Sequence, residues 1–282
     1  MTISMCSIGD NVLDRYPQEG LAFPGGSATN AAVFASRLGV SSSYIGIVGS
    51  DSAAAFIVES LESEGVDASR VRHQDAPNPI TDVVVNEDGN RRFLAFTVPE
   101  MELRLTDDDL AHLDTVDWIH TGHSSHVEHE VERMAARAPV SFDFSKRDLD
   151  YAAPLLPFVA LATFSRDDLS TDGCIDLLRS AVELGAGLAV VTRGAAGSVA
   201  MSGGRIVERA ASPTTVADTI GAGDAFQACL MTELTRGRSL DAALEVASDF
   251  AAETCAHRGA FGHERRLSEF SDDGEVVSLD SR

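Results

Sequence analysis

The chain has 282 residues, a length that suits one large α/β domain or one domain with a small lid. Its hydrophobic content of 44% is enough for a sizeable core, and no apolar run approaches membrane-spanning length. The formal net charge is −22, so the surface repels nucleic acid and anionic membranes, and we exclude both as partners.

The acidic surplus has two explanations. Lys146 is the only lysine, and every other basic residue is an arginine. A dense carboxylate surface suits a protein adapted to high intracellular salt, where self-repulsion is screened. A GC-rich genome would also favour arginine over lysine, but it does not by itself require so many acidic residues, so we favour salt adaptation.

The four cysteines are scattered in apolar surroundings and form no Cys-x-x-Cys pair (Cys6, Cys174, Cys229, Cys255). This pattern is typical of buried free thiols in a cytoplasmic protein, not of a disulfide framework or a zinc site. The N-terminus has no basic region before its short apolar stretch, so we expect no signal peptide and a cytoplasmic location.

A first strand is expected over residues 4–8, where a short apolar run ends at Gly9. Asp10, Asn11 and Asp14 follow it. Polar groups just past the carboxyl end of a strand lie where open α/β sheets bind ligands. Asp10 and Asn11 also suit a simple turn, whereas Asp14 follows two apolar residues and can point back into a cleft.

A glycine pair precedes the first expected helix. Residues 15–24 contain two prolines and are expected to be irregular. Gly25 and Gly26 then open a helix that ends near Gly39, and they allow the backbone to approach a ligand closely. Asn30, one turn into the helix, can reach the same site. The alternative is a plain turn with Asn30 in solvent.

A hairpin then interrupts the alternation of strands and helices. Residues 80–85 and 91–97 alternate in polarity, and the Asp-Gly of residues 87–90 is a hairpin signal. We expect a lid formed by residues of about 11–24 and 79–98, as a small sheet over the cleft. An exposed sheet of this kind often also forms a dimer contact, so a homodimer through the lid is expected.

Further polar residues follow the later strands. His123 comes directly after a strand expected at 117–121 and is a candidate substrate contact. A metal site from His123, His126 and His129 lacks a matching carboxylate pattern and is not expected. The apolar strand at 188–191 ends in the small-residue turn 192–197, which suits the phosphates of a nucleotide.

The most informative stretch is residues 218–226. Gly221, Ala222 and Gly223 form a tight turn before an apolar helix, and the amides of a helix N-terminus favour an anion. Asp224 lies in the first turn, where it can take a proton from a hydroxyl while the amides hold a phosphate. By itself the turn fits a merely capped helix, and Phe226 replaces the third glycine of a dinucleotide fingerprint.

Strand and helix patterns alternate along nearly the whole chain. This predicts a three-layer α/β/α fold with a mostly parallel central sheet, organised as one domain over residues 1–266. The last helix is expected from Leu240 to about His257. Residues 267–282 are polar and acidic and are expected to form a mobile tail.

Two spaced motifs carry a resemblance. With residues 25–30 (Gly-Gly-Ser-Ala-Thr-Asn) and 218–224 (Asp-Thr-Ile-Gly-Ala-Gly-Asp), the sequence resembles the ribokinase/PfkB family of sugar and nucleoside kinases over roughly residues 3–265. The resemblance implies a ribokinase-like fold with a β-sheet lid and transfer of phosphate from ATP, with magnesium, to a hydroxymethyl group.

The resemblance also implies roles for individual residues. Asp224 matches the catalytic base and Gly221, Ala222 and Gly223 match the anion hole. The residues matched or added as sugar contacts are Asn11, Asp14, Gly25, Gly26, Ser27, Asn30 and His123. Those assigned to the nucleotide are Arg147, Ser165, Thr192, Arg193, Gly194 and Gly197. Asp218 matches a position tied to a monovalent cation, which would be potassium.

Two departures bear on catalysis. Asp143, Ser145 and Arg147 match an Asp-x-Asn-x-Arg pattern with serine for asparagine, and Ser165 and Asp168 stand where many members have Asn-x-x-Glu. The usual magnesium–phosphate network is therefore expected to be arranged differently. These departures motivate an alternative, a non-catalytic sugar or nucleotide sensor, which the intact Asp224 and glycine turn argue against.

Four weaker features concern the substrate. Residues 8–11, 14–17, 142–145 and 258–263 resemble the fructoselysine 6-kinase branch of the family. They imply that the acceptor is the primary hydroxyl of a ketose or a fructosamine. Fructokinase, ribokinase and nucleoside kinase activities remain alternatives.

Overall fold

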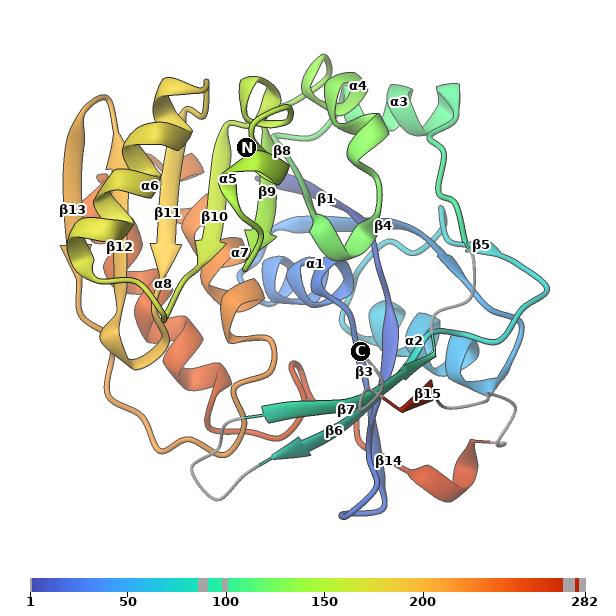
Figure 1. Ribbon diagram of the computed structural model, residues 1–282. Coiled ribbons are helices and arrows are strands. Elements are labelled where there is room, and N and C mark those ends of the chain that lie inside the picture. Colours follow the sequence, from blue (N-terminus) through green and yellow to red (C-terminus); the bar gives the residue numbers. More distant parts are fainter. Residues whose placement is uncertain (1, 86–90, 98–100, 271–276, 279–282) are drawn as a thin grey trace.

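A nine-stranded sheet forms the centre of the molecule in the computed structural model, which describes residues 2–85, 91–97, 101–270 and 277–278 (Figure 1). The strand order is β13-β12-β11-β10-β9-β8-β1-β4-β5. Seven strands pair in parallel, and β12 and β13 add antiparallel strands at one edge. The expected mostly parallel central sheet is confirmed.

The parallel strands are short and apolar because helices cover both of their faces. Their bounds are β1 Ser4–Gly9, β4 Ser41–Val48, β5 Arg72–His73, β8 Trp118–Gly122, β9 Val140–Ser145, β10 Leu161–Ser165 and β11 Leu188–Thr192. The antiparallel pair is β12 Ser198–Ser202 and β13 Arg205–Arg209, joined through Gly203 and Gly204.

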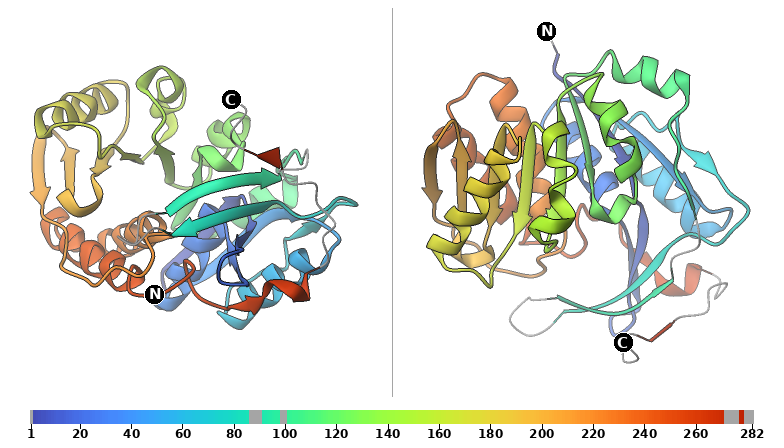
Figure 2. Two further views of the ribbon diagram at one scale, coloured as in Figure 1. Left: turned by 60° about the horizontal axis from the view of Figure 1, so that its bottom comes forward. Right: turned by 45° about the horizontal axis from the view of Figure 1, so that its top comes forward.

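Helices form the two outer layers (Figure 2). On one face, α1 (Ser27–Arg37), α7 (Ala222–Thr235) and α8 (Leu240–Thr254) share a core with the sheet. On the other lie α3 (Asp107–Leu113), α4 (Val131–Ala135), α5 (Leu149–Ala152) and α6 (Thr171–Glu183). α2 (Ser52–Ser63) packs beside α1 and the base of the lid. The three-layer expectation is confirmed.

A six-stranded sheet lies beyond the carboxyl ends of the central strands (Figure 1). Its order is β14-β3-β2-β6-β7-β15. The strands are β2 Val12–Tyr16, β3 Leu21–Gly25, β6 Ile80–Val85, β7 Arg91–Thr97, β14 Arg265–Arg266 and β15 Val277–Ser278. The small lid sheet is confirmed, and its turn at 86–90 lies outside the described residues.

Residues 15–24 were expected to be irregular, and most of them are strand. Arg15 pairs with Ala22 and Tyr16 with Leu21 across a tight turn. β2 also pairs in parallel with β6, about 67 residues further along the chain, as between Arg15 and Asp82. This long-range pairing fixes β2 as a strand despite the prolines, which local sequence patterns cannot reveal.

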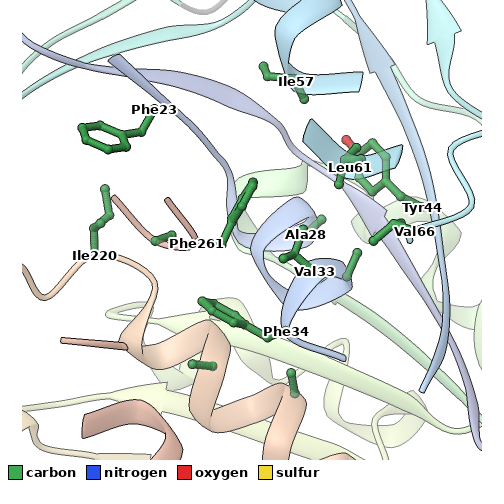
Figure 3. Packing of buried hydrophobic residues seen from close by; sticks show 14 of the residues in the cluster. Phe23, Ala28, Val33, Phe34, Tyr44, Ile57, Leu61, Val66, Ile220 and Phe261 are labelled. Atoms are coloured by element: carbon green, nitrogen blue, oxygen red, sulfur yellow. The ribbon is translucent and has the colours of Figure 1, made fainter. Parts of the chain in front are cut away.

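One core cluster joins the lid to the central layers (Figure 3). Figure 3 shows Phe23, Ile220 and Phe261, which are far apart in the sequence, gathered around α1 with its Phe34. Tyr44 of β4 belongs to the same cluster. The base of the lid, the turn before α7 and the loop after α8 are therefore packed as one unit.

The C-terminal region differs from the expected tail. Leu267 and Phe270 pack against the cluster that contains Phe56 of α2, and the Phe56 and Phe270 ring centroids lie 5.5 Å apart. Val277 and Ser278 pair with β7. α8 ends at Thr254 instead of His257. Within the described residues, no helix has the length and apolar character needed to cross a membrane.

Candidate active site

Polar residues follow five neighbouring strands along one edge of the central sheet. The register places Gly122 of β8 beside Asp143 of β9, and Ser165 of β10 beside Thr192 of β11. The lid sheet lies across this edge (Figure 1). The polar residues at or just beyond the strand ends are Asp10, His123, Asp143, Ser165 and Thr192. These expected site residues therefore share the side of the sheet that the lid faces, and the cleft expected there stays a prediction.

Asp224 is held in one orientation by the first turn of α1. Ser27 Oγ donates a hydrogen bond to Oδ1 of Asp224, and Asn30 Nδ2 donates to Oδ2, each at 2.7 Å. Asp224 itself lies in the first turn of α7 and is buried. The two glycine motifs of the sequence thus meet at a single carboxylate, with Ser27 and Asn30 as its donors.

The surroundings of Asp224 raise its pKa to near neutral pH, where the carboxylate can take up a proton. Burial is the main cause that raises the pKa of Asp224 to about 7, and the nearby carboxylates of Asp143 and Asp10 raise it further. The donors Asn30 and Ser27 oppose this shift. Burial likewise raises the pKa of Asp143 to about 6. A carboxylate that titrates near the working pH is well suited to act as a general base.

The turn before α7 is shaped as an anion site. Gly221 has φ 75°, and a Cβ there would lie 2.5 Å from Ala260 Cβ, so this position requires glycine. A Cβ on Gly223 would meet no atom within 4 Å, so the space beside the helix N-terminus is open. The amides and the dipole of α7 both favour an anion in this space.

Asp10 anchors the start of α1, a role the sequence did not reveal. Its carboxylate accepts hydrogen bonds from Ser27 N at 2.8 Å and Ala28 N at 3.2 Å, and from Ser125 Oγ at 2.8 Å. The N-cap of α1 is Gly26, which has no side chain to satisfy these amides. A glycine N-cap is thus the sequence signal for a capping carboxylate supplied from elsewhere.

The glycine pair lets the segment after β1 approach closely, whereas the ligand contact expected of these glycines stays a prediction. A Cβ on Gly25 would lie 2.1 Å from Asp14 Oδ2, and one on Gly26 would lie 2.6 Å from Asn11 Cα. Asn11 Nδ2 donates to Tyr44 OH at 3.1 Å and to a β4 carbonyl at 2.7 Å. Asn11 and Asp14 are therefore buried against the turn that carries Ser27.

Several buried side-chain oxygens accept no hydrogen bond from the described protein groups. Among the described residues, the side-chain oxygens Asn11 Oδ1, Asn30 Oδ1 and Gln227 Oε1 have no hydrogen-bond partner. Buried polar atoms in native proteins are normally paired, so these oxygens fit a ligand with several donors, such as sugar hydroxyls. Gln227 also bonds Asp143 and lies one helical turn after Asp224, a spacing that places both on one face of α7.

On the expected nucleotide side, Ser165 Oγ and Thr192 Oγ1 lie 3.2 Å apart. Asp168, three residues after Ser165, is engaged elsewhere. Arg166 Nε and Nη2 donate to its two carboxylate oxygens, each at 2.8 Å, and these bonds lower the pKa of Asp168 to about 2. The carboxylate at the family's Glu position is thus held by Arg166 at the surface.

The turn after β11 has free space beside Gly194, and its shape depends on the backbone conformation of its two glycines. Gly194 has φ 55° and a Cβ there would meet nothing within 4 Å, whereas a Cβ on Gly197 would strike the carbonyl oxygen of Arg209 at 2.0 Å. Arg193 Nη1 donates to Thr171 Oγ1 at 2.8 Å, which fixes its side chain against α6. The expected site residues Thr192, Arg193, Gly194 and Gly197 therefore form one loop, which is exposed at Gly194 and buried at Gly197.

Asp218 is fully buried and surrounded by donors. Its Oδ2 accepts from Tyr16 OH at 2.6 Å and from Gly259 N at 3.2 Å, and its Oδ1 accepts from Ile220 N at 3.0 Å. A carboxylate offers about four lone-pair positions, so three donors leave little room for a monovalent cation. The potassium role implied by the resemblance remains a prediction.

His123 and Arg147 lie at the rim of the cleft. Burial is the main cause that lowers the pKa of His123, followed by the positive charge of Arg147. The Arg147 guanidinium carbon lies 5.2 Å from the ring centroid of Tyr151. No group of three metal-ligating side chains occurs in the described ranges.

A family model described as pfkB family carbohydrate kinase matches residues 10–264. The chain belongs to this family. The pfkB match covers all of the expected site residues from Asp10 onward and both glycine motifs. The resemblance drawn from these motifs is therefore confirmed at the level of the family, and the chain is a carbohydrate kinase in sequence and fold.

Two similar curated pfkB relatives have related names. Fructosamine kinase FrlD of Bacillus subtilis strain 168 is 36% identical over 266 residues, which cover 93% of this chain and 94% of the relative. Fructoselysine 6-kinase of Escherichia coli strain K12 is 34% identical over 262 residues, covering 92% and 99%. The likeness to the fructoselysine 6-kinase branch is therefore confirmed.

Solved structures show the same fold at lower identity. Ribokinase of Arabidopsis thaliana, in complex with ribose and ATP, superimposes with a TM-score of 0.77 and 20% identity, covering 93% of this chain and 95% of its own. Fructokinase of Vibrio cholerae O395 gives a TM-score of 0.74 and 22% identity, covering 92% and 95%. These structures establish a ribokinase-like fold for the pfkB chain described here.

Proposed function

We propose that this pfkB kinase transfers the γ-phosphoryl group of ATP to the primary hydroxyl of a fructosamine. The observation that carries the proposal is Asp224, a buried carboxylate oriented by Ser27 and Asn30 beside an open helix N-terminus. The names of the relatives, fructosamine kinase and fructoselysine 6-kinase, support the substrate class.

The chemistry follows from this geometry. Asp224 takes the proton of the primary hydroxyl as its oxygen attacks the γ-phosphorus, and the bond from phosphorus to the β–γ bridging oxygen breaks to release ADP. The amides of residues 221–223 hold the charge on the transferred phosphoryl oxygens. Asn11, Asp14 and Asn30 orient the sugar, and closure of the lid excludes water.

We place the nucleotide at the carboxyl ends of β10 and β11, along the same edge of the central sheet. The loop of Thr192, Arg193, Gly194 and Gly197, with Ser165 beside it, offers backbone amides and hydroxyls for the phosphates. Magnesium usually keeps several waters and binds through substrate phosphates with one or two carboxylates. It would therefore enter with ATP, without a cage of protein ligands.

Two further expectations belong to this proposal. One is a homodimer through the lid sheet, and light scattering of the purified protein measures the oligomeric state directly. A cytoplasmic location agrees with the four thiols, which form no disulfide in the structure.

The test is an ADP-release assay at low and high potassium chloride. The panel contains fructoselysine, other fructosamines, fructose, ribose, 2-keto-3-deoxygluconate and adenosine. We expect a strong signal with fructosamines. A signal only with a plain sugar or nucleoside would keep the kinase chemistry and reject the substrate class.

The matched variants are Asp224→Asn and Asp172→Asn. Asp172 also lies in the first turn of a helix, α6, but its side chain is exposed. Asp224→Asn should abolish turnover while sugar binding persists, and Asp172→Asn should behave as the wild type. ATP and sugar binding without any turnover in the wild type would favour the sensor alternative.

A further inference from the structure

A group of polar and charged residues follows the carboxyl ends of β8 and β9. It comprises His123 in the turn at His123–Ser125, Glu128 in the next turn, and Arg147 and Tyr151 after β9, and we refer to these four residues as the charged rim. Ser125 connects the rim to Asp10, directly after β1, because its Oγ donates a hydrogen bond to Asp10 Oδ1 at 2.8 Å. A Cβ on Gly9 would lie 1.9 Å from that oxygen, so the turn rests directly on the end of β1.

Tyr151 holds the two opposite charges of the rim. Its hydroxyl donates to Oε1 of Glu128, and the guanidinium carbon of Arg147 lies 5.2 Å from its ring centroid. The hydroxyl orients the carboxylate, while the face of the ring favours a cation. One tyrosine therefore fixes an anion and a cation at separate positions.

Neither charge is neutralised by an ion pair. Among the described residues, no carboxylate lies within the 4.0 Å ion-pair distance of Arg147, and no cation lies within it of Glu128. Most of the other described arginines do form ion pairs, as expected for a chain with net charge −22. An unpaired arginine next to the cleft is thus available to an anionic ligand.

His123 is the rim residue that shares its turn with Ser125, which bonds Asp10. Its Nδ1 is buried and has no partner among the described residues. Asp10 links this turn to Asp224, because its carboxylate accepts from Ser125 Oγ and from Ser27 N, while Ser27 Oγ donates to Asp224. A ligand that extends from Asp224 past Asp10 would therefore reach the turn of His123, a side chain that interacts electrostatically with Arg147 and Glu128.

We propose that the charged rim binds the amino-acid end of the fructosamine, with Glu128 accepting the α-ammonium group and Arg147 donating to the α-carboxylate. Tyr151 is a positioning residue that holds both side chains, and His123 contacts the segment between sugar and amino acid. This inference rests on the proposed function. It assigns Arg147 to the sugar substrate, although the sequence resemblance placed it with the nucleotide.

The experiment uses three fructosamines that differ only at the amino-acid end. They are fructoselysine, its Nα-acetyl derivative, which lacks the α-ammonium charge, and the cadaverine analogue, which lacks the carboxylate. The kcat/KM of each is measured for the wild type, Glu128→Gln and Arg147→Gln, together with the KM for ATP. Glu132→Gln and Arg179→Gln are matched controls on exposed helix surfaces.

We expect the wild type to prefer fructoselysine over each analogue by about tenfold, the scale of one charge-assisted contact. Glu128→Gln should remove the preference over the acetylated compound, and Arg147→Gln the preference over the cadaverine compound. The KM for ATP should not change in either variant. Both controls should keep the wild-type ratios, since exposed charges contribute little.

Four results would overturn the inference. An equal loss of kcat/KM for all three compounds in a variant would show that the substituted residue has a merely structural role. A raised KM for ATP in Arg147→Gln would assign Arg147 to the nucleotide again. Equal use of all three fructosamines by the wild type would reject the rim and leave the proposed function standing. No turnover of any fructosamine would reject both.

Discussion

The hydroxyl of Tyr16 in the lid donates a 2.6 Å hydrogen bond to Oδ2 of Asp218, and these residues are 1% and 0% exposed. Asp218 lies three residues before the Gly221 turn and accepts two further bonds from backbone amides. The base of the lid and the anion site are therefore tied together through one buried carboxylate.

Tyr16→Phe removes one of these donors. We expect it to lower the free energy of unfolding by about 1–3 kcal/mol, because a buried charged acceptor is left less satisfied. Urea denaturation measures this change. An unfolding free energy equal to that of the wild type would contradict the role of Tyr16 as a support for Asp218.

Potassium dependence separates two roles of Asp218. If the three donors alone hold its charge, wild-type turnover should be equal in potassium chloride and in choline chloride of the same ionic strength. If a cation also binds this carboxylate, potassium should activate the enzyme. Steady-state rates in the two salts distinguish the donor-held carboxylate from the potassium ligand.

The pH profile should report Asp224. Its pKa is raised to about 7, chiefly by burial, and it must be ionised to accept a proton, so kcat/KM should fall below about pH 7. Asp143→Asn removes a like charge and should move this limb to lower pH. Ser27→Ala removes a donor to the ionised form and should move it to higher pH. Shifts in the same direction would contradict the assignment.

The same shift affects stability. Because the pKa of Asp224 is higher in the folded state than in the unfolded chain, folding takes up a proton between about pH 4 and pH 7. The contribution of Asp224 to stability is therefore present at low pH and is lost as the pH rises through this window. Asp224→Asn should flatten the pH dependence of the unfolding free energy, which urea titrations at several pH values measure.

Two glycines of one turn should respond differently to alanine. Gly221→Ala places a Cβ 2.5 Å from Ala260 Cβ at a positive φ, so we expect it to destabilise the fold by more than about 1 kcal/mol. Gly223→Ala meets no atom within 4 Å and adds helix propensity, so stability should be kept.

Gly223→Ala should nevertheless reduce turnover, because its methyl group enters the space assigned to the phosphoryl group. Thermal unfolding and ADP release on the two variants check these outcomes. A fully active Gly223→Ala would contradict the placement of the anion hole.

The net charge of −22 should make the fold sensitive to salt. Raising potassium chloride from ~0.1 M to ~1 M shortens the Debye length from about 10 Å to about 3 Å and screens the repulsion between surface carboxylates. We expect the urea midpoint to rise over this range, as salt adaptation requires. A midpoint independent of salt would favour genome composition as the origin of the arginine bias.

Short-range chemistry made much of the site predictable. A glycine turn before a helix encodes an anion site locally, so Gly221, Gly223 and Asp224 were correctly placed in one motif. The alternation of apolar runs with helical patterns likewise encoded the parallel sheet and the lid hairpin. These features depend on residues close together in the chain.

Contacts between segments that are distant in the chain could not be predicted from local sequence patterns. The capping of α1 by Asp10, the pairing of β2 with β6 and the Tyr16–Asp218 bond each join residues far apart in the chain. Nothing in the local pattern around one partner identifies the other. The packing of Phe270 on Phe56, within an apparently polar tail, is of the same kind.

The sequence by itself thus determined the family and most of the order of elements, and it singled out Asp224 as the candidate base. The tertiary structure alone decided which donors orient Asp224, what raises its pKa and which charges surround the cleft. The physical reason is that burial and hydrogen-bond partnership depend on where the folded chain brings its segments together, whereas turn and helix signals depend only on neighbouring residues.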